Sequence, residues 1–244
     1  MKKILIIGAS SDIGISLIKK LSPQNYQIGA HCFKGKKILE KVLKKSSNRY
    51  KIFVKNLSSQ ASCNKLVQEY IKWSKGVDGL VQLNGNISKL KLWNKLNEKN
   101  WNKDFLVNLS TPFFITQKIF EKMKKKGGKI ILMSTASAKF GGGKNTIAYG
   151  IAKSGVQSLT KFLAREGGKF KILVNCVAPG LILTKFHKDK LKRSRKDLLK
   201  RKKMNKLNEF GSPEEIAFLI SNLLSNETKF ITGEILKIDG GDWI

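Results

Sequence analysis

A tyrosine and a lysine four positions apart are the residues best suited to proton transfer. Tyr149 and Lys153 lie in an amphipathic stretch that predicts a helix over Tyr149–Gly167. A separation of four places the phenol and the ammonium on one helix face, one turn apart. The ammonium favours the phenolate and lowers the pKa of the phenol from about 10. Tyr149 is therefore a candidate for exchanging a proton with a substrate oxygen, although such pairs also occur on helices that do no chemistry.

Two polar features precede this pair. The segment Ser134-Thr135-Ala136-Ser137 follows a predicted strand and carries three hydroxyls 12 to 15 residues before Tyr149. Asn108 stands inside the predicted helix Trp101–Lys125, where asparagine has poor helix propensity. A hydroxyl can polarise a substrate carbonyl, and Asn108 can serve as a hydrogen-bonding group within its helix.

Two loops have the composition of a nucleotide site. Gly8-Ala9-Ser10-Ser11-Asp12-Ile13-Gly14 lies between a short apolar strand and a predicted helix. Its small residues let the backbone approach a pyrophosphate, whose charge the free N–H groups and the helix dipole stabilise. Its spacing does not match G-x-G-x-x-G, and tight turns without a ligand also use glycines. Pro179-Gly180-Leu181-Ile182-Leu183-Thr184 follows the carboxyl end of another predicted strand, where open parallel sheets bind ligands.

These residues depend for their positions on alternating strands and helices. The predicted strands are Lys3–Ile7, Gln27–Cys32, Lys51–Lys55, Gly79–Leu83, Lys129–Ser134, Ile172–Ala178 and Glu234–Ile238. The predicted helices are Asp12–Leu21, Lys36–Lys45, Cys63–Lys75, Trp101–Lys125, Tyr149–Gly167 and Pro213–Leu224. This alternation is typical of right-handed βαβ units. The sequence predicts an α/β fold: a single-domain, Rossmann-type, doubly wound parallel sheet over residues 1–244, with helices on both faces.

Helix ends support this prediction. Ser212-Pro213-Glu214-Glu215 has the pattern of a capping box with proline at the first helical position, so its two carboxylates indicate a helix start rather than a catalytic dyad. Gly127-Gly128 and Gly167-Gly168 are predicted to end two long helices.

Together, in this order and spacing, the five features resemble the short-chain dehydrogenase/reductase (SDR) family, classical type, across essentially the whole chain. They look most similar to its bacterial 3-oxoacyl-[acyl-carrier-protein] reductases. The resemblance implies hydride transfer between a nicotinamide and a carbonyl or alcohol carbon. It gives Tyr149 the role of general acid in reduction, and Lys153 the roles of lowering the Tyr149 pKa and binding the nicotinamide ribose. It implies that Thr135 orients the substrate oxygen and that Asn108 holds a water that relays protons.

The resemblance also implies a cofactor site. No metal site is expected, because His31 and His187 are too far apart in the sequence and no cluster of cysteines and histidines exists. The cofactor-binding residues carried over are Gly8, Ser10, Ser11, Asp12, Ile13, Gly14, Lys34, Asn56, Leu57, Asn84, Gly85, Tyr149, Lys153, Pro179, Gly180, Ile182 and Thr184.

Three cofactor-site positions depart from the family pattern. Ile7 stands where the family has threonine, and Gln82-Leu83-Asn84-Gly85 stands where it has Asn-Asn-Ala-Gly. Asp12 replaces the middle glycine of the first loop. Its carboxylate would repel a pyrophosphate unless the side chain points away.

The catalytic serine of the family has no clear counterpart. Its position falls on Thr135 in an alignment on Gly141, and on Ala136 at the family's usual distance from Tyr149. Thr135 keeps a hydroxyl, and Ser134 and Ser137 remain as alternatives. This departure and the altered Gln82–Gly85 segment leave a non-catalytic nucleotide-binding scaffold as a rival hypothesis.

Charge after the second predicted strand bears on the choice of cofactor. NAD-preferring members of the family carry an aspartate there, but residues 31–37 (His-Cys-Phe-Lys-Gly-Lys-Lys) contain no acid. Lys34, helped by Lys36 or Lys37, would attract a 2′-phosphate. We therefore expect NADP rather than NAD, unless these lysines only reflect the general excess of lysine.

Composition limits the partners and the compartment. The 244 residues carry 48 Lys+Arg against 17 Asp+Glu, a net charge of +31, and 41% are hydrophobic, enough for a core. Only five of the basic residues are arginines and no nucleic-acid-binding motif accompanies them, so no nucleic-acid partner is expected; binding to DNA through the basic surface is a rival. Three widely spaced cysteines indicate a reducing compartment. No run approaches the ~20 apolar residues of a membrane span, so a cytoplasmic protein is expected.

The family's mobile substrate lid corresponds here to residues 181–210. Within it, Lys185–Lys206 carries twelve Lys or Arg against two acids. Such a charge suits an anionic carbonyl substrate, either bound to an acidic carrier protein or a phosphorylated or nucleotide-linked molecule such as a sugar, or it reflects composition alone. The resemblance also implies a homotetramer, built through helices that begin near Trp101 and Tyr149.

Overall fold

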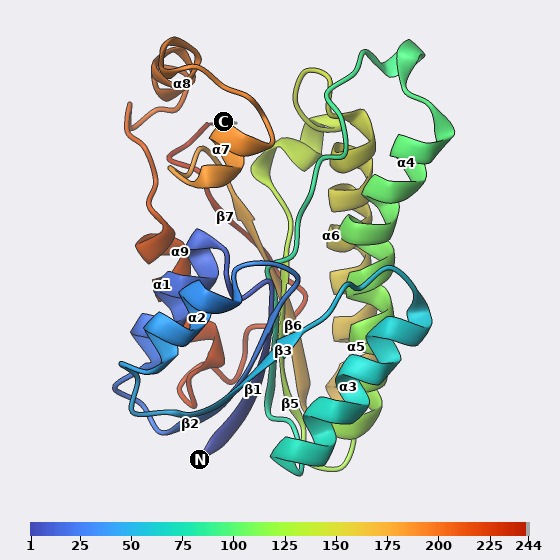
Figure 1. Cartoon of the computed structure of the whole chain (residues 1–244), viewed down its shortest axis with the longest axis vertical. Helices are drawn as coiled ribbons and strands as arrows, with labels where there is room; N and C mark the ends of the chain where they lie inside the picture. Colours follow the sequence, from blue (N-terminus) through green and yellow to red (C-terminus); the bar gives the residue numbers. More distant parts are fainter. Residues whose placement is uncertain (243–244) are drawn as a thin grey trace.

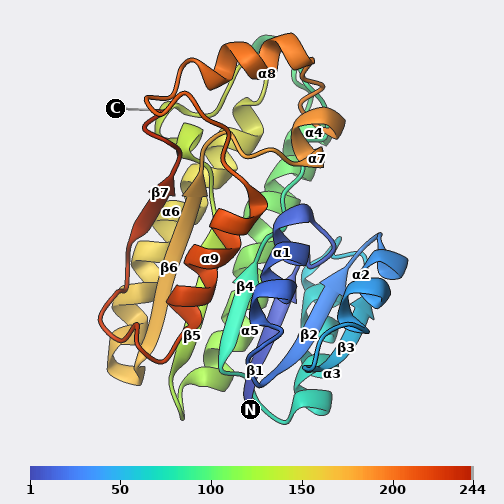
Figure 2. The ribbon, with the colours of Figure 1, turned by 90° about the vertical axis from the view of Figure 1, so that its left-hand side faces the viewer.

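A computed structural model describes residues 1–242 and folds them around one seven-stranded parallel sheet. The strand order is β3-β2-β1-β4-β5-β6-β7 (Figure 2), a doubly wound order. The strands are β1 (Lys2–Ile7), β2 (Tyr26–Cys32), β3 (Arg49–Val54), β4 (Gly79–Gln82), β5 (Gly128–Met133), β6 (Ile172–Pro179) and β7 (Ile235–Ile238). The seven predicted strands are confirmed, with ends shifted by at most two residues.

Helices cover both faces of this sheet. One face carries α1 (Asp12–Leu21), α2 (Lys36–Leu43) and α9 (Pro213–Leu224), which come to the front in Figure 2. The other face carries α3 (Gln60–Ser74), α5 (Thr111–Met123) and α6 (Ile147–Gly167). Because successive strand residues point to opposite faces, Ile4 and Ile6 enter one apolar cluster while Leu5 and Ile7 enter the other. The predicted α/β architecture is confirmed.

The single helix predicted over Trp101–Lys125 is wrong. The structure divides this stretch into α4 (Glu98–Phe105), a π-helix η2 (Leu106–Ser110) and α5. Pro112 explains the break, because a proline cannot donate the backbone bond that a regular helix would direct to the carbonyl four residues earlier, here that of Asn108. Gly127, predicted to end this helix, adopts φ +76°, and its N–H donates to the Met123 carbonyl at 2.8 Å, which closes the turn after α5.

The predicted start of α9 is confirmed. The Ser212 backbone N–H donates to Glu215 Oε2 (2.6 Å), and the Glu215 N–H donates to Ser212 Oγ (3.2 Å), which completes the capping box. Glu214 accepts a hydrogen bond from Ser16 Oγ at 2.7 Å, which joins α9 to α1. α6 ends at Gly167, as predicted.

Residues 181–210 contain two short helices that the sequence did not predict, α7 (Lys185–Asp189) and α8 (Arg195–Lys202). They lie above the carboxyl ends of the strands (Figure 1). Three 3₁₀ turns complete the elements: η1 (Trp93–Lys95), η3 (Ala136–Phe140) and η4 (Gly168–Phe170). None of the helices within residues 1–242 is long and apolar enough to span a bilayer.

We predict that Gly29→Ala destabilises the fold. A Cβ at Gly29, on β2, would lie 2.5 Å from two ring carbons of the buried Tyr70 on α3, and overpacking of this kind costs roughly 1–3 kcal/mol. Gly168→Ala is the matched control, because a Cβ there meets nothing within 4 Å and its φ of −52° is helical. Urea unfolding should show a lower free energy of unfolding only for Gly29→Ala. Equal values for the two variants would contradict this packing argument.

Candidate active site

The site lies where the sheet order reverses, between the carboxyl ends of β1 and β4. Gly8 follows β1 with φ +76°, a left-handed conformation that favours glycine. A Cβ on Gly8 would lie 3.1 Å from the backbone nitrogen of Asn84, which follows β4. The two loops therefore approach each other closely only because residue 8 is glycine.

The glycine-rich turn closes on itself and opens α1 toward this crevice. Ser11 Oγ donates to the Gly8 carbonyl (2.8 Å) and accepts from the Gly14 N–H (3.1 Å), which makes Ser11 the N-cap of α1. A Cβ on Gly14 would lie 2.5 Å from the Ala9 carbonyl oxygen. Ile13 packs against the apolar cluster below. The partly exposed helix N-terminus that results is suited to an anionic group.

Asp12 does not direct its carboxylate into this turn. Its Oδ2 accepts a hydrogen bond from the backbone N–H of Lys185, the first residue of α7, at 2.7 Å. The Asp12 carboxylate, which the sequence analysis expected to repel a pyrophosphate unless it pointed away, is thus directed toward the lid.

A histidine that the sequence analysis did not select supports the same turn. The buried His31, on β2, has Nδ1 3.5 Å from the Gly8 backbone nitrogen and Nε2 3.0 Å from the Lys55 carbonyl oxygen. Because the Gly8 N–H donates, Nδ1 accepts and Nε2–H donates, which requires a neutral ring. Burial lowers the His31 pKa to about 4, so the ring is neutral at physiological pH. The only signal in the sequence is a histidine near the end of an apolar strand.

Beyond β2 and β3, the candidate cofactor residues differ in their surroundings. Lys34 is exposed, and its carbonyl accepts a bond from Ser10 Oγ (2.8 Å), which joins the two loops. The Leu57 carbonyl accepts from Thr111 Oγ1 (3.3 Å), and its side chain packs on the core. Asn56 is exposed after β3. The structure therefore joins Ser10 to the Lys34 loop but leaves Asn56 at the surface.

The predicted Tyr149–Lys153 pair shares one face of α6. Lys153 is only 2% exposed, and its Nζ lies 5.9 Å from the centroid of the Tyr149 ring. The ammonium donates to the Asn84 carbonyl (3.1 Å) and the Met133 carbonyl (2.8 Å). Burial lowers the Lys153 pKa to about 8.

The expected direction of the Tyr149 pKa is wrong for this arrangement. Burial raises the Tyr149 pKa above its usual value of about 10, because the loss of water around the phenolate outweighs the nearby ammonium. The ring also contacts Phe186 of α7, with centroids 5.9 Å apart. Tyr149 therefore holds its proton at neutral pH, as a proton donor must.

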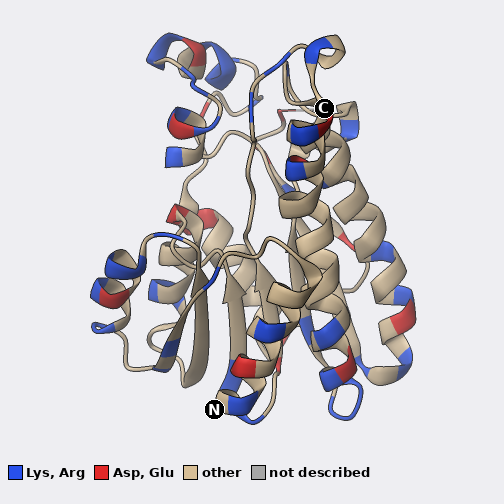
Figure 3. Cartoon of the chain, turned by 45° about the vertical axis from the view of Figure 1, so that its right-hand side comes forward, with Lys and Arg blue, Asp and Glu red and all other residues tan. Residues whose placement is uncertain are grey.

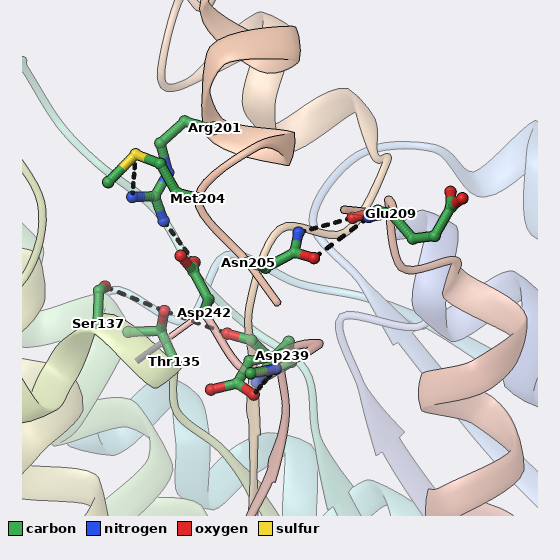
Figure 4. A network of polar contacts seen from close by, with 10 residues as sticks. Thr135, Ser137, Arg201, Met204, Asn205, Glu209, Asp239 and Asp242 are labelled. Carbon is green, nitrogen blue, oxygen red and sulfur yellow. Dashed lines mark hydrogen bonds and ion pairs between the residues drawn. The ribbon is translucent and has the colours of Figure 1, made fainter. Parts of the chain in front are cut away.

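The three candidate hydroxyls separate into two groups. Ser134 is buried, donating to the Lys153 carbonyl (2.8 Å) and accepting from Gln157 Nε2 (3.0 Å), so it joins β5 to α6. Thr135 Oγ1 lies 3.2 Å from Ser137 Oγ and 3.5 Å from the Pro179 carbonyl oxygen (Figure 4). Thr135 and Ser137, both partly exposed, are the hydroxyls that remain available to a ligand.

Asn108 is fully buried, and protein groups engage its side chain. Its amide Nδ2 donates to the carbonyls of Asn86 and Asp104, both at 2.7 Å, and its Oδ1 accepts from the Asn86 N–H at 3.0 Å. The neighbouring Asn84 Nδ2 donates to the Val107 carbonyl at 2.6 Å. These bonds hold the loop after β4 against the π-helix.

Gly85 marks the point where these groups converge. A Cβ on Gly85 would meet Asn108 Oδ1 at 3.7 Å and Lys153 Nζ at 4.0 Å. The structure therefore brings together Asn84, Gly85, Asn108 and Lys153, which the resemblance had linked only by analogy.

The loop after β6 closes the crevice from the other side. The Gly180 N–H donates to the Ile238 carbonyl of β7 (3.0 Å), and a Cβ on Gly180 would lie 2.6 Å from Asp239 Cα. Ile182 forms a parallel bridge with Gly211. Thr184 then occupies the N-cap position of α7 without a side-chain capping bond. The chain thus enters the lid through Pro179 and Gly180, and Ile182 and Thr184 belong to the first residues of the lid.

The lid also contacts the chain after β7, through residues that the sequence analysis did not select. Arg201 of α8 donates to Asp242 Oδ2 at 2.5 Å, and the Asp242 side chain is 1% exposed (Figure 4). The Asp242 carboxylate lies in the turn after β7. This strand pairs with Pro179 at the end of β6, and the Pro179 carbonyl oxygen is the group that Thr135 Oγ1 contacts. No local pattern in the sequence indicates an ion pair between residues so far apart.

Comparison with known proteins agrees with this geometry. A family model described as enoyl-(acyl carrier protein) reductase matches residues 8–242. The 3-oxoacyl-[acyl-carrier-protein] reductase FabG of Aquifex aeolicus is 31% identical over 244 residues, covering 97% of this chain and 95% of the relative. The acetoacetyl-CoA reductase of Acinetobacter sp. is 30% identical over 248 residues, covering 98% and 97%.

Solved structures agree on the fold. A short-chain dehydrogenase/reductase from Serratia marcescens matches with a TM-score of 0.90 and 24% sequence identity, covering 100% of this chain and 98% of that structure. The chain therefore belongs to the short-chain dehydrogenase/reductase family, and it is an oxidoreductase of the kind that acts on CH–OH or carbonyl groups.

Proposed function

We propose that this protein reduces the 3-oxo group of an acyl thioester with NADPH in the cytoplasm. The observation that carries the proposal is the placement of Tyr149 and Lys153 on one face of α6, with the Lys153 ammonium bound to the loop that faces Gly8. A scaffold that only binds nucleotide has no need for a protonated phenol beside a buried ammonium. The non-catalytic alternative is therefore disfavoured.

The crevice has the features that a dinucleotide requires. Gly8 and Gly14 leave no room for side chains, and the N-terminus of α1 favours a phosphate. Asn84 Oδ1 is buried without a hydrogen-bond partner among residues 1–242, so an acceptor remains for a donor on the cofactor. Bound there, the nicotinamide would supply the hydride. Lys153 uses two of its three N–H donors on carbonyls, which leaves one for a ribose hydroxyl.

Each side chain then has a separate role in the proton transfer. Thr135 or Ser137 holds the substrate oxygen, and Tyr149 gives it a proton as the carbonyl carbon is reduced. The Lys153 ammonium stabilises the phenolate that remains. Because Pro112 cannot donate to the Asn108 carbonyl, that carbonyl is suited to hold a water that returns a proton from solvent.

Charge supports NADPH and an anionic carrier. The Lys34 carbonyl accepts a bond from Ser10 Oγ of the glycine-rich turn, and residues 31–37 contain no acid. The names of the two relatives above refer to 3-oxoacyl-[acyl-carrier-protein] and to acetoacetyl-CoA, which are both 3-oxoacyl thioesters. Figure 3 shows basic residues on most helices, including the lid. A negatively charged carrier would be attracted to such a surface.

Exposed phenylalanines on α5 and α6 support the homotetramer that the resemblance implies. Phe113 of α5 and Phe162 of α6 are 40% and 52% exposed, and they border a cavity of about 300 Å³ between these helices. Large exposed apolar patches mark interaction sites. The three cysteines are unpaired and buried, which is in keeping with a reducing compartment.

We predict that Tyr149→Phe removes turnover but not cofactor binding. The variant lacks the donated proton and keeps the ring, so kcat for 3-oxoacyl reduction should fall by at least about 100-fold. The NADPH dissociation constant, measured by fluorescence, should stay within about twofold. Tyr50→Phe, on the edge strand β3, is the control and should retain full activity. A Tyr149→Phe enzyme with wild-type kcat would disprove the role of the phenol.

The pH dependence should report Lys153. Its pKa is about 8, so the ammonium is lost as pH rises through 8, and with it the charge that stabilises the Tyr149 phenolate. The raised Tyr149 pKa keeps the phenol protonated over the same range. We expect kcat/KM for NADPH-dependent reduction to be level from about pH 6 and to fall above about pH 8. A level profile up to about pH 10 would exclude this role for the ammonium.

Reversing the charge at Lys34 should change the cofactor preference. We expect Lys34→Asp to raise the KM for NADPH by about tenfold or more, equivalent to about 1.4 kcal/mol, and to lower the KM for NADH. Lys41→Asp, in the last turn of α2, makes the same change in net charge and should leave the NADPH/NADH ratio unaltered. If both variants shift the ratio equally, the preference comes from overall charge and not from Lys34.

A further inference from the structure

One side-chain contact joins the glycine-rich turn to the lid. Asp12, in the first turn of α1, accepts a hydrogen bond at 2.7 Å from the backbone N–H of Lys185, 173 residues later. Thr184, at the N-cap position of α7, makes no side-chain capping bond. Its Oγ1 points back toward the Ile182 carbonyl oxygen, which lies 3.5 Å away. The Asp12 carboxylate therefore takes the place of the missing cap on α7.

This contact spans an open space. A cavity of about 550 Å³ separates α1 from the lid, lined on the α1 side by Asp12, Ser16 and Lys19 and on the lid side by Thr184, Lys185 and Lys188. The lid is also attached next to this cavity, where the Leu183 N–H donates to the Gly211 carbonyl at 2.9 Å. Because the cavity separates these side chains, the hydrogen bond has a large share in fixing α7 relative to α1.

The position of α7 matters for Tyr149. Phe186 follows Lys185 directly and contacts the Tyr149 ring, with centroids 5.9 Å apart. If α7 moves away from α1, Phe186 leaves the phenol, and water gains access to it. The burial that raises the Tyr149 pKa thus depends in part on where α7 lies.

We propose that Asp12 is a positioning residue that holds the lid helix α7 over Tyr149 through its bond to the Lys185 N–H. The carboxylate has two opposing effects. Its charge lies near the phosphate site at the N-terminus of α1 and weakens anion binding there, whereas its oxygen keeps the lid closed. The effect on the lid follows from the structure alone, while its effect on turnover rests on the proposed function.

Two substitutions separate charge from hydrogen bonding. Asp12→Ala removes both, whereas Asp12→Asn removes the charge and keeps an oxygen that can accept from Lys185. Ser11 remains the N-cap of α1 in both variants. Asp189→Ala, at the end of α7, is the matched control, because it removes an acid of the lid without touching the Asp12 bond.

Limited trypsin digestion measures lid opening without reference to activity. Lys185–Lys206 offers twelve Lys or Arg, and mass spectrometry locates the cleavages. We expect Asp12→Ala to be cut there about fivefold to tenfold faster than the wild type, in the range of a lost helix cap. Asp12→Asn and Asp189→Ala should be cut at about the wild-type rate. Equal rates for Asp12→Ala and the wild type, or an Asp12→Asn rate as fast as that of Asp12→Ala, would overturn the proposal.

Kinetics and cofactor titration provide the second measurement. In Asp12→Ala, the KM for the 3-oxoacyl substrate should rise about fivefold or more while the NADPH dissociation constant does not increase. Asp12→Asn should restore the substrate KM and bind NADPH more tightly than the wild type. Weaker NADPH binding in both variants would instead make Asp12 a direct cofactor ligand and overturn the proposal. If no carbonyl substrate is reduced, the proposed function fails, but the digestion result still decides the role of Asp12.

Discussion

The Lys153 ammonium joins the three elements on which the site depends. It projects from α6 and binds the carbonyls of Met133, at the end of β5, and of Asn84, after β4. Burial of a charge without partners would be prohibitive, and the two carbonyls offset much of that cost, although the lowered Lys153 pKa shows that some of it remains. Ser134 adds a bond to the Lys153 carbonyl. The interactions that fix α6 against the sheet therefore also aim Tyr149, one helical turn earlier, at the crevice.

A second constraint acts from the helix that faces Lys153. Pro112 interrupts the regular backbone pattern, and the chain accommodates it with a π-helix over Leu106–Ser110. Two asparagine amides join this irregular region to the loop after β4: Asn84 binds the Val107 carbonyl, and Asn108 binds the Asn86 carbonyl. Through these bonds the irregular helix holds the loop after β4, the same loop that Lys153 holds from the opposite side. Asn108 therefore contributes to the site first as a structural clamp, in keeping with the hydrogen-bonding role that its position inside a predicted helix indicated.

What the sequence could predict follows from the range of each interaction. The strands and most helices depend on local periodicity, and the Tyr149–Lys153 contact needs only a spacing of four, so both were predicted correctly. The bond from Asp12 to Lys185 and the bonds of His31 to neighbouring strands join residues that only the folded sheet brings together. The direction of the Tyr149 pKa was predicted wrongly because the spacing argument included one neighbour and omitted burial, which depends on the packing of the whole site.

The excess of basic residues in the lid explains why carboxylates outside it, those of Asp12 and Asp242, hold it in place. Within the lid, the stretch Lys185–Lys206 has only two acids, and one of them, Asp197, completes the capping box of α8 with Ser194. Its many basic residues repel one another, so the lid needs outside partners, which Asp12 and Asp242 supply. Added salt screens the repulsion between exposed lysines more strongly than it screens a buried pair, and the Asp242 side chain is 1% exposed. Moderate salt should therefore favour the closed lid, while it weakens the attraction of an anionic carrier to the outer surface of the same segment.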